Sequence, residues 1–186
     1  MAEAELDAAL GLGEERQMMA SSYDPRLESA HATESVVYLP TPYPVCRALF
    51  HTTAPQSRDL VVDLGCGSGR LVLYGALCTS ARFLGVELIG QRCAAGQRTV
   101  TRLSLGQVEI VEGNVLDLDL EPGTLFYLFR PFSKETETTM MTRLHNLARR
   151  RAITVAAYRL LPTLFDPQIF DCTVIGDLRI YRSTEV

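Results

Sequence analysis

Leu60-Val-Val-Asp-Leu-Gly-Cys-Gly-Ser-Gly69 joins a short apolar run to three glycines that are spaced by single residues. The apolar run is typical of a buried parallel strand. Glycines directly after such a strand let the backbone turn sharply and approach a ligand that a Cβ atom would exclude. Gly65, Gly67 and Gly69 form the pattern G-x-G-x-G, and Arg70 stands where a dinucleotide fingerprint has its last small residue. The segment therefore predicts a nucleotide-binding loop. Because of Arg70 and the G-x-G-x-G spacing, a nicotinamide dinucleotide is the less favoured ligand.

A second short apolar strand, residues 81–87, ends in the carboxylate of Glu87, 22 residues after Gly65. In nucleotide-binding α/β folds, a carboxylate at this place accepts hydrogen bonds from the ribose hydroxyls. An exposed glutamate at a strand end is the simpler alternative. The spacing of Glu87 from the glycine loop favours the interpretation that Glu87 binds the ribose.

Three motifs together resemble the class I S-adenosylmethionine-dependent methyltransferases: Asp63–Gly69, then Gly85–Glu87, then Glu112–Asn114 after a third strand. The resemblance spans about residues 38–183 and implies S-adenosylmethionine as the cofactor. Two further segments look like small members related to protein-lysine methyltransferases. They are Tyr38-Leu-Pro-Thr-Pro42 before a helix and Phe126-Tyr-Leu-Phe-Arg-Pro-Phe132 after the fourth strand.

The resemblance implies a role for each motif residue. Asp63 and the loop backbone would face the methionine end of the cofactor, and Glu87 would hold the ribose. Asn114 would accept a hydrogen bond from the adenine amino group, between Leu88 and Val115 on the two faces of the ring. The predicted cofactor-binding residues are Thr41, Asp63, Gly65, Cys66, Gly67, Gly69, Glu87, Leu88, Asn114, Val115 and Phe129.

The segment Phe129-Arg-Pro-Phe132 follows the fourth strand, on the side where open α/β sheets bind ligands. Enzymes that methylate amide or base nitrogens often carry Asn or Asp there. Arg130 takes that place here and cannot accept a proton or a hydrogen bond, which disfavours base or glutamine N-methylation. Phe129 and Phe132 would suit a wall around an amine, and equally suit core packing. The catalytic residues stay unknown, with Tyr38, Arg130 and Phe132 as candidates, and Tyr38 is also suited to packing.

Strand patterns alternate with helical patterns from residue 58 onward. This alternation predicts an α/β fold, a doubly wound Rossmann-like seven-stranded sheet that is mostly parallel. Gly176-Asp177 between two strand patterns predicts a hairpin, so the C-terminal strand should be antiparallel. Beyond the strand at Leu60, the expected strands are 81–87, 107–111, 124–129, 153–158, 171–175 and 178–182, and the expected helices include 69–78 and 90–104.

Helix ends carry their own signals. Thr41 and Pro42 match an N-cap followed by a proline at the first helical position, and Ser133 matches the N-cap of a later helix. Arg149–Arg151 follow that later helix, where positive charge complements the helix dipole. We therefore interpret the arginine run as a helix-end feature in preference to a ligand clamp.

The 186 residues, 47% hydrophobic and 22% charged, are typical of one globular domain. We expect a helical, partly mobile N-terminal appendage at residues 1–37 and a methyltransferase domain at residues 38–186. The net charge of −4 disfavours nucleic acid as a partner. No secretory signal and no membrane span is expected. Five scattered cysteines suggest free thiols in the cytoplasm, and the histidines show no metal-ligand spacing.

The first functional hypothesis is methyl transfer to an amine, with protein lysine as the first acceptor and a small molecule as the second. A cofactor-binding but inactive interaction module is the alternative, because the acceptor-side Asn or Asp is missing and the loops are short. The sequence identifies neither the acceptor nor the oligomeric state, nor the role of residues 1–37.

Overall fold

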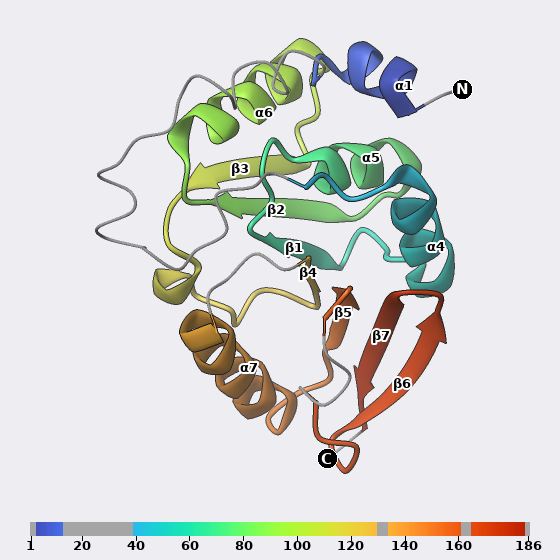
Figure 1. Cartoon of the computed structure of the whole chain (residues 1–186), viewed down its shortest axis with the longest axis vertical. Coiled ribbons are helices and arrows are strands. Elements are labelled where there is room, and N and C mark those ends of the chain that lie inside the picture. The colour runs from blue at the N-terminus through green and yellow to red at the C-terminus, as the bar shows by residue number, and fades with distance from the viewer. Residues whose placement is uncertain (1–2, 13–38, 130–133, 161–164, 185–186) are drawn as a thin grey trace.

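One seven-stranded sheet forms the centre of the molecule, with strand order β3-β2-β1-β4-β5-β7-β6 (Figure 1). The computed structural model describes residues 3–12, 39–129, 134–160 and 165–184. The strands are β1 (Leu60–Leu64), β2 (Arg82–Glu87), β3 (Val108–Glu112), β4 (Leu125–Leu128), β5 (Thr154–Tyr158), β6 (Phe170–Ile175) and β7 (Leu178–Ser183). The helices are α1 (Glu3–Leu10), α4 (Tyr43–Thr53), α5 (Arg70–Cys78), α6 (Gly90–Arg102), the 3-10 turn η1 (Val115–Asp117) and α7 (Lys134–Ala148).

The strand directions confirm the predicted doubly wound fold. β1, β2, β3, β4 and β5 run parallel, whereas β7 is antiparallel to both β5 and β6. The predicted strands after β1 are present, with ends that differ from the expected ones by at most one residue. The predicted C-terminal hairpin is the β6–β7 pair.

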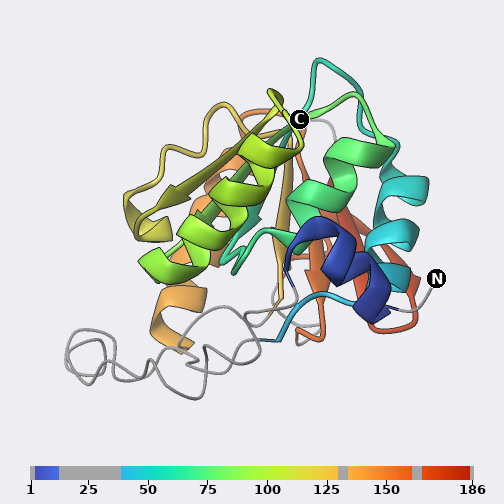
Figure 2. The ribbon, with the colours of Figure 1, turned by 90° about the horizontal axis from the view of Figure 1, so that it is seen from above.

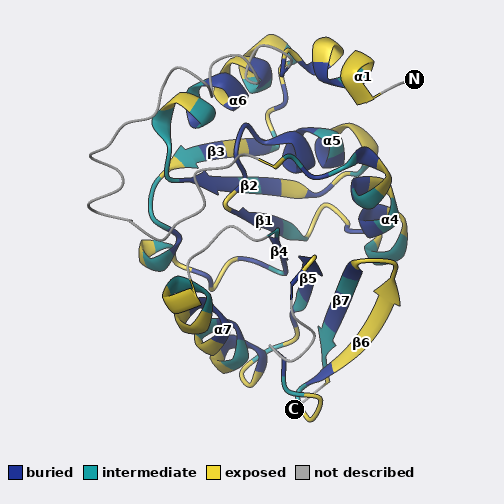
Figure 3. Cartoon of the chain, viewed as in Figure 1, coloured by how far each residue is buried: buried dark blue, intermediate teal, exposed yellow. Residues whose placement is uncertain are grey.

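Helices cover both faces of the sheet and divide the core in two (Figures 1 and 2). α4, α5 and α6 pack on one face, with α1 beside them, around residues such as Val61, Phe83 and Tyr127. α7 packs on the other face, around residues such as Val62 and Phe126. The central strands are therefore buried on both sides, which explains their continuous apolar sequences. The edge strand β6 is exposed over most of its length (Figure 3).

The carboxyl ends of β1 and β4 lie side by side at the point where the strand order reverses. From β1 the chain builds β2 and β3 on one side, and β4 and β5 on the other. The loops that leave two such strands go to opposite faces, so a crevice opens between them, and open α/β sheets bind ligands there. The glycine loop begins at this point.

One helix start differs from the prediction. α4 begins at Tyr43, its N-cap residue is Pro42, and no side chain caps it. The Thr41 hydroxyl instead pairs with the Tyr127 hydroxyl of β4 at 3.0 Å. The prediction that Thr41 is the N-cap is wrong because a tertiary partner takes its hydroxyl. Ser133, the other predicted N-cap, lies outside the described residues.

Candidate functional site

The glycine loop after β1 folds back on the end of β2. The backbone N–H groups of Gly65 and Cys66 both donate to the Val86 carbonyl at 2.9 Å, and Gly69 N–H donates to the Cys66 carbonyl at 2.9 Å. Gly67 and Gly69 have φ angles of 57° and 84°, a left-handed conformation that side chains disfavour. The sequence therefore needs glycine here for the turn itself.

Two further glycines make room behind the loop. A Cβ atom on Gly85 of β2 would lie 2.7 Å from the Cys66 sulfur, and one on Gly96 of α6 would lie 2.7 Å from the Ser68 carbonyl oxygen. Gly96 shapes the site, although it was not among the residues predicted from the sequence. Glycine inside a helix costs about 1 kcal/mol relative to alanine, and that cost was the available signal for a close approach.

Glu87 is buried and its carboxylate is tied to the loop. It accepts hydrogen bonds from Gly67 N–H at 2.8 Å and from Ile89 N–H at 3.0 Å, and Arg92 of α6 pairs with it at 3.6 Å. A carboxylate has about four acceptor positions, and two backbone donors leave capacity for two hydroxyl donors. The geometry thus fits a ribose diol, and the role stays a prediction.

Asp63, the last carboxylate of β1, is buried, and it makes no hydrogen bond or ion pair within the described residues. Burial, together with the neighbouring charge of Glu87, raises its pKa to about 8. A buried carboxyl without a partner is costly in a folded protein unless a ligand or water pairs with it. Its chemistry fits a ligand with an ammonium group, as the methionine end of S-adenosylmethionine has.

The other predicted cofactor residues lie around these two carboxylates. Cys66 is buried in the loop, where burial raises the pKa of its thiol well above the usual value and so disfavours the thiolate that a nucleophile needs. Leu88 follows β2 and is half-buried, and Val115 is buried in η1. The Asn114 oxygen accepts from Leu116 N–H at 2.9 Å, which leaves its second lone pair free for another donor.

Arg70 links the loop to the N-terminal helix α1. Its buried guanidinium pairs with Asp7, lies 4.8 Å from the Tyr43 ring centre and donates to the Thr41 carbonyl at 3.1 Å. The Tyr43 hydroxyl donates to the same Asp7 carboxylate at 2.8 Å. A cation at a helix N-terminus opposes the helix dipole, so Asp7 offsets an unfavourable position.

The acceptor side is described only as far as Phe129. Its ring packs against the Tyr158 ring at the end of β5, with centroids 4.7 Å apart and planes at 60°. The catalytic candidates Tyr38, Arg130 and Phe132 lie outside the described residues. Tyr158 was not predicted, because a tyrosine that ends an apolar strand pattern has no sequence signal of its own.

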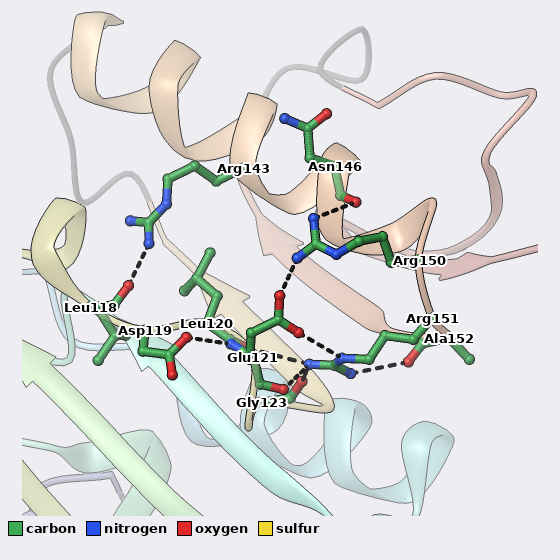
Figure 4. A network of polar contacts seen from close by, with 10 residues as sticks. All are labelled: Leu118, Asp119, Leu120, Glu121, Gly123, Arg143, Asn146, Arg150, Arg151 and Ala152. Atoms are coloured by element: carbon green, nitrogen blue, oxygen red, sulfur yellow. Dashed lines mark hydrogen bonds and ion pairs between the residues drawn. The ribbon is translucent and has the colours of Figure 1, made fainter.

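The arginine run after α7 has structural partners. Arg150 pairs with Glu121, and Arg151 donates to the carbonyls of Leu120 and Gly123 at 3.3 and 2.6 Å (Figure 4). These contacts hold the loop before β4, at the amino ends of the strands and away from the glycine loop. They border a hollow of about 230 Å³ that is lined by Asp119, Leu120, Glu121, Arg143, Asn146, Leu147 and Arg150.

Within the described residues, each helix is too short or too polar to cross a bilayer.

Comparison with known sequences gives relatives that share about half of the chain. A protein-lysine N-methyltransferase from Saccharolobus islandicus is 30% identical over 96 residues, covering 50% of this chain and 60% of that protein. A demethylmenaquinone methyltransferase from Bacillus mycoides is 28% identical over 95 residues, covering 51% of this chain and 40% of that protein. The chain thus spans less than two thirds of either relative, and no protein-family model matches it.

Solved structures share the fold over most of the chain. An RNA methyltransferase from Salinibacter ruber, in complex with S-adenosyl-L-homocysteine, aligns with a TM-score of 0.65 and 20% identity, covering 78% of this chain and 92% of that one. The putative methyltransferase yhhF from Escherichia coli aligns with a TM-score of 0.63 and 21% identity, covering 80% of this chain and 92% of that one. By their names, these relatives differ in acceptor, so proteins with this fold do not share one acceptor class.

Proposed function

Because this chain belongs by fold to the class I S-adenosylmethionine-dependent methyltransferase family, we propose that it binds S-adenosylmethionine and transfers its methyl group to an amine. The observation that carries the proposal is the pair of buried carboxylates on the two sides of the glycine loop. Asp63 has no partner among the described residues, and Glu87 has spare acceptor capacity.

The cofactor presents donors that match this pair. Asp63 would hold the methionine ammonium, and Glu87 would hold the ribose hydroxyls. Leu88 and Val115 would enclose the adenine, with the free lone pair of Asn114 toward its amino group.

An amine acceptor agrees with the residues on the other side of the crevice. When bound, S-adenosylmethionine supplies a sulfonium methyl group, and the carbon–sulfur electron pair returns to sulfur as the amine lone pair forms the new carbon–nitrogen bond. The methylated nitrogen then gives its proton to water. The aromatic pair Phe129–Tyr158 supplies ring surface that favours the positive charge growing on this nitrogen. Protein lysine is our first acceptor and a small-molecule amine the second, and the similarity to a protein-lysine methyltransferase supports that order.

Calorimetric titration with S-adenosylhomocysteine tests the cofactor site. Replacing Glu87 by alanine should weaken binding about ten- to hundredfold, because the ribose hydroxyls lose a charged acceptor worth about 1.5–3 kcal/mol. Glu112→Ala is the matched control, since Glu112 ends the next strand but is exposed. Equal affinities of the Glu87 variant and the parent would reject the ribose role, and tight NADH binding would reject the cofactor.

Transfer of labelled methyl groups to a fractionated cell extract tests the activity and identifies the acceptor. We expect the label in a protein or small-molecule amine, and loss of labelling in the Asp63→Asn variant. A parent protein that binds S-adenosylhomocysteine but labels nothing would support the inactive interaction module.

A further inference from the structure

Tyr158 lies in a row with the glycine loop along the carboxyl edge of the sheet. Leu64 of β1 pairs with Leu128 of β4, and Leu128 pairs with Ala157 of β5. The next residue on each strand is therefore Gly65, Phe129 and Tyr158 in turn, at a strand spacing of about 4.8 Å. Tyr158 thus ends the strand next to β4, on the side of the loop opposite Glu87.

Tyr158 also shares its face of the sheet with Asp63. Asp63 is in register with Tyr127, and Tyr127 with Ala156, so these side chains and Tyr158, two residues on, point the same way. The pKa of Tyr127 is raised chiefly by burial, and the charges of Asp63 and Tyr158 add to the increase, as groups close to it would. Tyr158 therefore lies on the same face of the sheet as Asp63, with Tyr127 on the strand between them.

The hydroxyl of Tyr158 has no hydrogen-bond partner in the described part of the chain, although the residue is only 7% exposed. The hydroxyl oxygen is not one of the fully buried, unpartnered atoms of the described residues, so water or a ligand can reach it. The Tyr158 ring is held against Phe129, so the free hydroxyl has a defined place at the carboxyl edge of the sheet.

The turn after Tyr158 is strained and held from the C-terminal hairpin. Arg159 has a φ angle of 54°, a left-handed conformation that is unusual for a residue with a side chain. Its N–H donates to the Asp177 carbonyl at 3.1 Å, its Nε lies 3.2 Å from the Asp177 carboxylate, and its guanidinium lies 5.3 Å from the Tyr158 ring centre. Such strain persists where the surrounding structure enforces it, often at functional sites.

We propose that Tyr158 is an acceptor-binding residue whose hydroxyl oxygen accepts a hydrogen bond from the N–H of the amine that receives the methyl group. The inference rests on the proposed function and adds a residue to its acceptor side. The amine nitrogen gains positive charge as it attacks, so its N–H becomes a stronger donor to the phenol oxygen. The Tyr158 and Phe129 rings stabilise the same charge.

Two cofactor analogues test this inference without an identified acceptor. S-adenosylhomocysteine lacks the transferred methyl group, whereas sinefungin carries an amine in the place of that group. Calorimetry on the full chain should show that Tyr158→Phe weakens the binding of sinefungin about tenfold, which corresponds to the loss of one charge-assisted hydrogen bond. The affinity for S-adenosylhomocysteine should change less than about twofold. Tyr181→Phe is the matched control, since Tyr181 is equally buried but belongs to the core on the other face.

The outcomes separate the inference from the proposed function. If the parent binds neither analogue, both are overturned. If the parent binds both analogues and Tyr158→Phe leaves the ratio of the two affinities unchanged, only the role of Tyr158 is overturned. A second variant, Phe129→Leu, removes the ring partner and keeps the hydroxyl. It should weaken the binding of sinefungin about threefold more than the binding of S-adenosylhomocysteine, as one lost cation–ring contact predicts.

Discussion

The two halves of the carboxyl edge are held in different ways. In the nucleoside half, formed by β1, β2, the glycine loop and α6, partners lie close in sequence: Gly67 and Glu87 are 20 residues apart, and Ile89 donates to Glu87 from two residues away. In the acceptor half, formed by β4 and β5, the Thr41 and Tyr127 hydroxyls that pair with each other are 86 residues apart. The nucleoside half binds one cofactor and therefore needs one preorganised shape. The acceptor half is assembled from segments that are distant in the sequence, so these segments can vary independently.

Arg70 is the exception in the nucleoside half, since its partner Asp7 lies 63 residues away, and its removal should have the largest effect. Asp7→Asn leaves a buried guanidinium without its main counter-charge, and we expect a loss of about 3–5 kcal/mol in the free energy of unfolding. Urea unfolding measures this loss. Glu121→Gln breaks an exposed pair with Arg150 and should cost less than about 1 kcal/mol. Similar costs for the two variants would show that α1 adds nothing to the loop.

Gly96 tests whether close packing shapes the loop. Gly96→Ala places a Cβ atom against the Ser68 carbonyl, and because a backbone atom cannot move away freely, we expect a loss of about 1–3 kcal/mol. Gly106→Ala is the control, since a Cβ atom there meets nothing within 4 Å. Thermal unfolding compares the two. A Gly96→Ala protein as stable as the control would show that the loop tolerates displacement.

Asp63 connects the halves, and its pKa of about 8 predicts a pH dependence. Below pH 8 most of the carboxyl is protonated in the free protein and only the carboxylate pairs with an ammonium ion, so S-adenosylhomocysteine affinity should rise by about fiftyfold in total between pH 6 and 8. Calorimetry at several pH values measures the slope, and Asp63→Asn should abolish it. An equal slope in that variant would place the titrating group elsewhere.

The raised pKa of Asp63 also predicts the direction in which the free energy of unfolding changes with pH. The unfolded Asp63 carboxyl loses its proton near the ordinary pKa of 3.8, while the folded one keeps it to about pH 8, so the folded state binds more protons in between. The free energy of unfolding should therefore fall between pH 4 and 8 more steeply in the parent than in Asp63→Asn. Urea unfolding across that range checks this difference.

Arg159 should give the smallest effect. Arg159→Gly relieves the left-handed backbone, worth about 1 kcal/mol, but removes an exposed ion pair and a cation–ring contact of similar total size. We expect a net change of less than about 1 kcal/mol by urea unfolding. A large loss would show that the β6–β7 turn stabilises the acceptor half more than its exposed contacts imply.

Much of the nucleoside half could be predicted from the sequence. The pattern of Gly65, Gly67 and Gly69 indicates a strand-to-helix turn. Glu87 follows at the spacing that one strand–helix–strand unit requires. The N-cap assigned to Thr41 was wrong because the pattern could not reveal that Tyr127 would take its hydroxyl. Tyr38, Arg130 and Phe132, which lie outside the described residues, stay predictions.

Local patterns were sufficient wherever the physical cause is local. Apolar runs, helix spacing and glycines at a turn are properties of a few neighbouring residues, so the positions of the strands along the chain and the glycine loop follow from the sequence. The packing of Gly96 against Ser68, the pairing of Arg70 with Asp7 and the place of Tyr158 beside Phe129 depend on strand register and on segments far apart in the chain. Only the tertiary structure decides these contacts, because the local sequence around a residue does not indicate which distant residue folding brings next to it.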